Sequence, residues 1–267
     1  MPKTLIDETI CSAWRDFFEN DYKSEIETLA TAFPEKRSIY IDYDRIDKKN
    51  PEFAEKLLNE PYKYIFNAEE TFKEIDTAVG HIKPHVRFIN LPDISKKSIR
   101  DLRSEHVGKF VSVEGLVKKD TTIRANVKIA AFQCQKCGAI IKVEQDEEIL
   151  KEPSECFEDQ GGCGRSSTMK LISALSGFID GQKIQLQENL EGLRGQQPVK
   201  ITVFLEDDLV GKIFPGDRIR INGILSAIQR RRGTFRLTGF DFAINAISIE
   251  INETLYEEIN ITDKEKK

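Results

Sequence analysis

The sequence contains no run of about 18 apolar residues, and its N-terminus lacks the pattern of a secretory signal peptide. Five cysteines, four of them clustered, fit a reducing compartment better than a secreted disulfide framework. An excess of positive charge is also missing, because 45 acidic and 40 basic residues give a net charge of -5. Any nucleic-acid binding must therefore depend on local clustering. We expect a cytoplasmic protein of one large or two to three small domains.

A phosphate-binding loop of the type Gly-x4-Gly-Lys-[Ser/Thr] is missing too. The two Gly-Lys pairs end at Lys109 and Lys212, and neither pair is followed by Ser or Thr. Arg103 and Glu206 stand where the first glycine belongs. We therefore predict that this chain neither binds ATP tightly nor hydrolyses it, and that it is not itself an enzyme.

The four clustered cysteines form two pairs, separated by two and by six residues: Cys134, Cys137, Cys156 and Cys163. Two such pairs meeting at a hairpin complete the tetrahedron of a structural zinc ion, although the second gap is longer than usual. A disulfide and plain reduced cysteines are the alternatives. A closed four-thiolate site leaves no position for water, so the predicted metal is structural. Gly138 and Gly164 follow the two pairs, where a tight turn needs a positive φ.

Residues 1–100 have apolar residues at helical spacing and predict a small helical bundle. Residues 38–43 alternate briefly and predict a short strand, while Asn50 and Pro51 predict a helix start. A further helix is expected from residue 61 to residue 78. His81 and His85 lack a second ligand at a recognisable spacing, so we expect them on a loop surface. The fifth cysteine, Cys11, is expected to be a small core residue.

From residue 101 onwards the sequence changes to short alternating strands interrupted by glycines, the pattern of an OB-fold β-barrel. We expect its first part at 101–129, an inserted zinc-binding finger at 130–172, and its second part at 173–255. A hairpin is expected within the second part, at about 225–240. Residues 256–267 are polar and predict a tail or linker. The expected fold class is therefore α+β with several subdomains.

Positive charge gathers between Gly211 and Arg236, where seven basic residues and one acid give a local charge of +6. Three of these residues, Arg230, Arg231 and Arg232, lie between two strand-like segments, so we predict a hairpin tip that binds phosphate. The alternative is a solvated turn. A second basic group precedes the finger, and its alternative is a solvated barrel rim: Lys118, Lys119, Arg124 and Lys128. Residues 144–159 hold eight acids and one lysine, so the finger is expected to contact protein rather than phosphate.

Five segments occur in the order found in the N-terminal region of archaeal minichromosome maintenance (MCM) replicative helicases, which this chain resembles from about residue 98 to 250. They are 99–117, the pair Cys134 and Cys137, 195–198, 205–210 and 215–224. The resemblance implies a hexameric ring, pairing of two rings through the finger, and an arginine-bearing hairpin at 228–236 that lines the channel. It also implies single- and double-stranded DNA as partners and a nucleoid-associated protein.

The same resemblance implies a loop that contacts a neighbouring AAA+ ATPase domain, at Gln187, Glu188, Gly195, Gln196, Gln197 and Pro198. A single-strand-binding surface is implied at Arg124 and Lys128, with Lys200 as a plausible substitute, while Gln185 stands where arginine is usual. ATP and Mg²⁺ would act only in an AAA+ motor that this chain lacks. The full-length parent would unwind DNA at replication forks, and the chain would be its N-terminal part.

Two other functions compete with a ring-forming DNA-binding domain. One is a free-standing OB-fold protein that binds single-stranded DNA and carries a zinc ribbon, and the other is an assembly scaffold. Aromatic residues on a barrel face would favour the first, because strand binding without sequence preference relies on base stacking. The candidates are Phe235, Phe240 and Phe242, whose spacing suits core packing at least as well.

Overall fold

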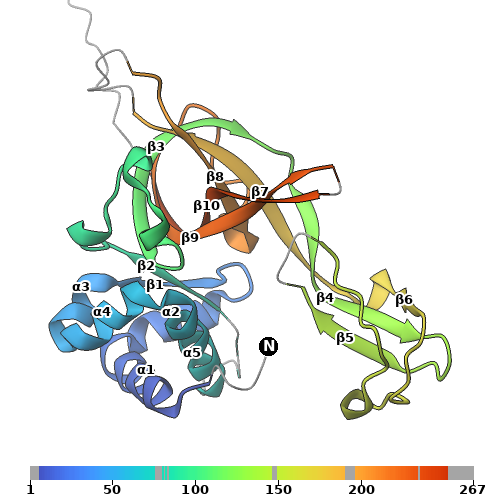
Figure 1. Ribbon diagram of the computed structural model, residues 1–267. Coiled ribbons are helices and arrows are strands. Elements are labelled where there is room, and N and C mark those ends of the chain that lie inside the picture. The colour runs from blue at the N-terminus through green and yellow to red at the C-terminus, as the bar shows by residue number, and fades with distance from the viewer. Residues whose placement is uncertain are drawn as a thin grey trace, which may run out of the picture.

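The computed structural model describes residues 6–75, 80, 82, 84–145, 149–189, 196–233 and 235–251, with Arg232 described by its backbone alone. Within these ranges no helix is long and apolar enough to cross a membrane. A helical bundle lies at one end of a β-barrel, and a finger extends away from the barrel (Figure 1). The expected α+β class, with a bundle, an OB-fold barrel and an inserted finger, is confirmed.

The helical bundle contains α1 (Glu8–Asp21), α2 (Lys23–Ala32), α3 (Tyr43–Lys49), α4 (Pro51–Asn59) and α5 (Pro61–Glu74). Its core is centred on Trp14, which is fully buried and donates its indole N–H to the carbonyl oxygen of Tyr64 at 3.0 Å. Asn50 caps α4 by accepting the Phe53 N–H at 3.1 Å, as its position before Pro51 predicts. Helix α5 ends before the predicted residue 78, which lies outside the described ranges.

The bundle also holds a parallel two-stranded sheet of β1 (Ser38–Asp42) and β2 (His85–Ile89). The first strand was expected, but the second was not. The prediction of a surface loop is wrong for His85, because His85 begins β2 and is half-buried. A parallel pairing over such a distance in the chain leaves no local turn signal, and this explains why the sequence did not indicate the strand.

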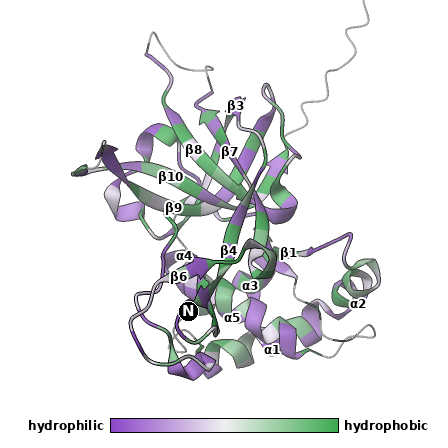
Figure 2. Ribbon diagram, turned by 90° about the vertical axis from the view of Figure 1, so that its right-hand side faces the viewer, coloured by the Kyte–Doolittle hydropathy of each residue, from purple (hydrophilic) through white to green (hydrophobic). Residues whose placement is uncertain are grey.

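The barrel is formed by β3 (Phe110–Asp120), β7 (Gly177–Gln187), β8 (Lys200–Glu206), β9 (Arg218–Arg232) and β10 (Phe235–Ile251). Strand pairings run β3–β9–β10–β8–β7 and return to β3. The β8–β10 ladder is parallel and contains only three residue pairs, so the barrel is not strictly closed along its height. Figure 2 shows hydrophobic and hydrophilic residues alternating along β7 and β8, as one buried face requires. A glycine is required at position 115, where β3 crosses β7, because a Cβ there would lie 2.5 Å from the Gln187 carbonyl oxygen.

The finger is formed by the second half of β4 (Arg124–Cys134), together with β5 (Ile140–Glu144) and β6 (Met169–Leu171). The first half of β4 pairs with β7 of the barrel. One continuous strand therefore joins the barrel to the finger. The finger has a small core of its own around the buried residues Cys134, Ile141 and Cys156.

Polar side chains join the bundle to the barrel. Arg87 on β2 is buried, pairs with Asp208, and donates to the carbonyl oxygen of Ile247 at 2.7 Å. Burial would raise the pKa of Asp208, but Arg87 and the Ser38 hydroxyl outweigh it and lower that pKa. Next to this pair, Nε2 of His85 lies 2.8 Å from Oδ2 of Asp207. The two units are thus connected by an ionic network as well as by apolar packing.

Candidate metal centre and nucleic-acid interface

The four clustered cysteines meet at one point of the finger. Their sulfur atoms all lie within 4.8 Å of one another, and those of Cys137 and Cys156 are 3.6 Å apart. A tetrahedral zinc ion with Zn–S bonds of about 2.3 Å separates its sulfurs by about 3.8 Å. None of the described cysteines forms a disulfide. The donor set and its spacing therefore fit one tetrahedral metal ion.

Two backbone turns hold the sulfurs in place. Cys134 ends β4, and its carbonyl oxygen accepts the Gly138 N–H at 2.9 Å. The Cys156 carbonyl oxygen accepts the Gly164 N–H at 2.9 Å in the second turn. Both glycines have positive φ, 78° and 65°, as predicted. The longer second gap is accommodated by a short 3-10 turn at Glu158–Gln160, which brings the fourth thiol back to the site.

The thiols differ in how readily they lose a proton. A hydrogen bond with Ser167 is the main reason that the pKa of Cys134 is lowered to about 6, while burial raises the pKa of Cys156 to about 12. Four thiolates so close together repel one another unless a cation lies between them. A bound divalent ion would supply that charge and favour the ionised form of all four. The chemistry of the cluster is consequently that of a closed structural site.

The predicted arginine hairpin consists of the outer halves of β9 and β10, which extend past the barrel (Figure 1). Arg230 and Arg231 are exposed on β9, and the backbone of Arg232 pairs with Phe235. Nε of Arg230 lies 3.6 Å from Oδ2 of Asp241, so an acid partly offsets its charge. Sequence reasoning missed this partner because it lies across the hairpin, eleven positions further along the chain.

A residue that was not selected from the sequence joins the hairpin site. Arg236 pairs directly with Arg231 across the two strands, so both guanidinium groups lie on one face. Among the described residues, neither arginine has an ion-pair partner. The signal was present in the sequence, because Arg236 belongs to the basic stretch, but only the strand register places it beside Arg231.

Three of the other predicted DNA contacts share the outer face of the barrel. Lys119 lies opposite Gln185, Lys200 opposite Gln187, and Arg124 opposite Gly181. Gly181, Gln185 and Gln187 lie an even number of positions apart, so they share the face of β7 that is opposite the core side chains of Ile184 and Leu186. Their cross-strand neighbours Lys119, Lys200 and Arg124 are exposed on this outer face.

The other basic residues on this side of the barrel differ from one another in their surroundings. Lys118 is exposed at a register shift of β3, and Nζ of Lys128 lies 3.5 Å from Oε2 of Glu206. The exposed Lys183 was not predicted, yet it lies on the same outer face with its ammonium 5.0 Å from the centre of the Phe204 ring. The outer face thus has a row of basic residues, of which Lys128 is offset by the Glu206 carboxylate.

The predicted inter-domain loop lies at one end of the barrel. Its described residues are Gln187, Glu188, Gln196, Gln197 and Pro198, while Gly195 lies outside the described ranges. Gln187 is the buried last residue of β7. Arg100 connects the two sides of the loop, since Nη2 donates to the Glu188 carboxylate at 3.2 Å and to the Gln197 carbonyl oxygen at 3.0 Å. Arg100 was not selected from the sequence and positions this loop.

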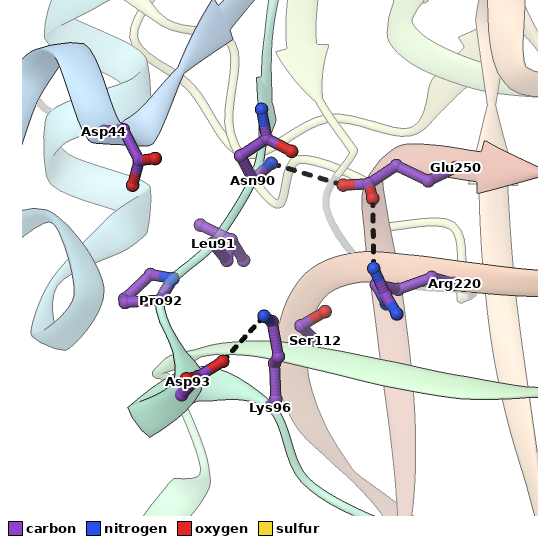
Figure 3. A pocket seen from close by; sticks show the side chains of 9 residues that line it. All are labelled: Asp44, Asn90, Leu91, Pro92, Asp93, Lys96, Ser112, Arg220 and Glu250. Atoms are coloured by element: carbon purple, nitrogen blue, oxygen red, sulfur yellow. Dashed lines mark hydrogen bonds and ion pairs between the residues drawn. The ribbon is translucent and has the colours of Figure 1, made fainter.

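A cavity of about 570 Å³ opens where the bundle meets the barrel, and Figure 3 shows its lining. Its two cations are paired with carboxylates of the lining: Lys96 with Asp93 at 2.7 Å, and Arg220 with Glu250 at 3.5 Å. Because both cations already have carboxylate partners, the cavity is poorly suited to bind a phosphate. The hairpin and the outer barrel face are therefore the candidate nucleic-acid interface.

Comparisons with known proteins agree with this architecture. The family model described as the MCM N-terminal domain matches residues 12–103, and the MCM OB domain matches residues 98–229. The 1.8 Å crystal structure of the N-terminal domain of an archaeal MCM superposes with a TM-score of 0.76 at 34% identity. That alignment covers 92% of this chain and 99% of the solved chain.

Longer relatives match over part of their length. A minichromosome maintenance protein MCM of Saccharolobus solfataricus is 27% identical over 93% of this chain and 37% of its own length. The DNA replication licensing factor mcm4 of Schizosaccharomyces pombe is 32% identical over 61% of this chain and 17% of its own length. This chain therefore spans less than two fifths of these two curated relatives.

Proposed function

Because this chain belongs to the minichromosome maintenance family, we propose that it is the DNA-binding and ring-assembling N-terminal region of a replicative helicase. The observation that carries the proposal is the β9–β10 hairpin, which brings a dense set of arginines beyond the barrel in a chain of net charge -5. Guanidinium groups bind phosphates bidentately. The partners are single- and double-stranded DNA.

We propose that Cys134, Cys137, Cys156 and Cys163 hold one structural zinc ion. Four thiolates close the coordination shell, so the ion fixes the shape of the finger and activates no water. The acidic finger contacts protein, and a second ring is its proposed partner. Self-association into a hexamer, or into two paired hexamers, places the hairpins around a central channel.

The proposed subdomains are the bundle at 1–100, the barrel at 101–129 and 173–255, and the finger at 130–172. The loop held by Arg100 is the proposed contact with an AAA+ motor domain of the same polypeptide. The motor would supply ATP hydrolysis with Mg²⁺, while this chain binds DNA and hydrolyses no ATP. Replication on chromosomal DNA places the protein in the cytoplasm, at the nucleoid.

A salt titration tests the DNA-binding surface. Changing Arg230, Arg231 and Arg232 to alanine should weaken binding to every DNA sequence alike, because phosphate contacts carry no sequence information. The slope of log affinity against log salt should flatten by about 0.9 per lost phosphate contact on duplex, or about 0.7 on a single strand. Measurements of size in parallel should show unchanged assembly, since the tip faces the channel.

A control removes the same charge elsewhere: Lys23, Lys36 and Lys48 are exposed on the bundle and can be changed to alanine together. This control should bind DNA nearly as the unchanged protein does. Equal slopes and affinities for the arginine variant and the unchanged protein would instead place the DNA surface on the outer barrel face.

Two other functions are less well supported. A free-standing OB-fold single-strand-binding protein would explain the barrel but not the bundle, which matches the MCM N-terminal domain model. An assembly scaffold leaves the arginine hairpin without a role. Sizing the protein with and without DNA separates the three: a ring that retains DNA supports our proposal, a DNA-binding monomer supports the second function, and an assembly indifferent to DNA supports the third.

A further inference from the structure

Strand β10 has apolar side chains at every second position, and this pattern continues where the strand extends beyond the barrel. Ile244 is fully buried in the core, and Phe242 and Phe240 follow it at intervals of two residues towards the tip. Residues at this spacing share a face of the strand. Yet 36% of Phe242 and 53% of Phe240 is exposed. The core-facing side of the strand thus becomes an open aromatic surface on the hairpin.

Strand register places positive charge beside these rings. Phe242 lies opposite Ala227, Phe240 opposite Gln229, and Arg236 opposite Arg231. Since Ala227, Gln229 and Arg231 alternate along β9, all these side chains share one face. No acidic residue lies on this face between positions 226 and 243. We call it the aromatic face of the hairpin.

The opposite face of the hairpin is different. Ile228 lies opposite Asp241, whose carboxylate is 3.6 Å from Nε of Arg230. This side of the hairpin therefore has a partly neutralised charge, and its one exposed phenylalanine is Phe235, which lies opposite Arg232 at the tip. The other side has two arginines without an acid and two exposed rings. A simple phosphate clamp would need the arginines but not the rings.

We propose that the aromatic face is a stacking platform for unpaired bases, so that the hairpin prefers single-stranded over double-stranded nucleic acid. The inference rests on the proposed DNA-binding function and specifies the ligand of the same site. In a duplex each base is covered by its neighbours, whereas an unpaired base presents a π-face to a ring. Arginines at the tip bind the adjacent phosphates, and the excess positive charge disfavours a second copy of the same face.

The geometry of the hairpin also explains why base stacking would cost little conformational entropy. Gln229 donates from Nε2 to the Leu237 carbonyl oxygen at 3.0 Å, and this bond spans the register shift between Arg236 and Phe240. The hairpin backbone is thus braced beside the rings before any ligand binds. Rings on a preformed ribbon lose little conformational freedom when a base covers them.

The experiment uses two oligonucleotides of equal length and charge, one of thymidines and one of abasic sites, together with a duplex. The unchanged protein should bind the thymidine strand about fivefold or more tighter than the abasic strand for each stacked base. Phe240→Leu with Phe242→Leu keeps the apolar surface but removes the π-faces, so it should abolish this difference. Phe214→Leu is the matched control, because Phe214 is 64% exposed but precedes β9 at its far end.

Three outcomes would overturn the inference: equal affinity of the unchanged protein for both strands, equal loss of affinity for both strands in the double variant, or a change of assembly size in the double variant. The last would make the aromatic face a contact between copies of the chain. Failure of the proposed DNA-binding function looks different, because the unchanged protein would then bind none of the probes in a salt-dependent way.

Discussion

The finger and the hairpin both extend from one barrel on long β-strands, but they differ in which of their residues are buried and in their charge. The finger buries residues of its own, and its four cysteines gather at one point beside this small core. The hairpin has no buried residue among those described between positions 227 and 242. The finger carries a run of acids, while the hairpin carries four arginines and one acid between positions 226 and 243. The finger has its own core and a cysteine cluster that can stabilise its shape. The hairpin instead exposes aromatic rings and two arginines that no described acid pairs with, which are groups that a binding partner would cover.

Metal removal should have the largest effect and should act on the finger alone. Structural zinc contributes an apparent free energy of about 10–16 kcal/mol in small zinc domains, so its loss should unfold the finger. We expect Cys163→Ser, or a strong chelator, to make residues 130–172 susceptible to protease while the barrel and the DNA affinity survive. Limited proteolysis with metal analysis measures this.

Cys11→Ser provides the matched control for the metal experiment. Cys11 is a half-buried thiol of the bundle whose Sγ lies 3.2 Å from Oδ1 of Asn67, far from the cluster in the fold. This variant should retain one zinc per chain. A purified chain that folds normally with no metal would refute the zinc assignment.

The two faces of the hairpin should differ in DNA binding. Arg231→Ala with Arg236→Ala removes two cations that no described acid offsets, and each charged contact is worth about 1.5–3 kcal/mol. We therefore expect a loss of affinity of about tenfold or more. Arg230→Ala removes a cation already paired with Asp241 and should lose less than about threefold. Anisotropy titrations at fixed salt compare the variants, and a larger loss for Arg230→Ala would reverse our assignment of the faces.

Removing the acid of the hairpin should increase affinity. Asp241→Asn releases Arg230 from its exposed ion pair, and such pairs contribute about 0.2–1 kcal/mol. The expected gain is up to about fivefold and should shrink at high salt. Asp159→Asn makes the same change of charge on the distant finger and should have no effect. A gain of the same size in both variants would indicate a general charge effect instead.

We expect the smallest effect at the junction between bundle and barrel, where the protonation of His85 affects the stability of the fold. Hydrogen bonding to Glu69, with help from Asp207, raises the pKa of His85 above its ordinary value of 6.5 despite partial burial. A raised folded pKa means that protonated His85 stabilises the fold. This stabilisation is fully present below about pH 6.5 and is lost as pH rises through the folded pKa.

Urea unfolding across this pH range measures the junction effect. His85→Gln should remove the pH dependence in this window. Glu69→Gln should reduce it, because it removes the largest cause of the shift. Identical pH profiles for His85→Gln and the unchanged protein would show that His85 does not link protonation to folding.

Much of the fold could be predicted from the sequence because its signals are local. The cysteine spacing, the glycine after each pair, the cap at Asn50 and the alternating barrel strands each depend on a few neighbouring residues. Strand β2 could not be predicted, because its parallel partner β1 lies more than forty residues earlier in the chain. Arg100 was missed for a similar reason, since both sides of the loop that it holds come from distant positions.

The sequence by itself determined the kinds of chemistry available: four thiolates for a metal, a basic stretch in an acidic chain, and apolar residues at every second position of β10. Tertiary structure alone decided which of these groups meet. Phe240 and Phe242 follow the same alternation as the buried Ile244, yet they are exposed because the strand outruns the barrel that covers it. Whether a side chain is buried depends on which residues pack against it in the fold. The alternating pattern of a strand does not show where those packing residues end.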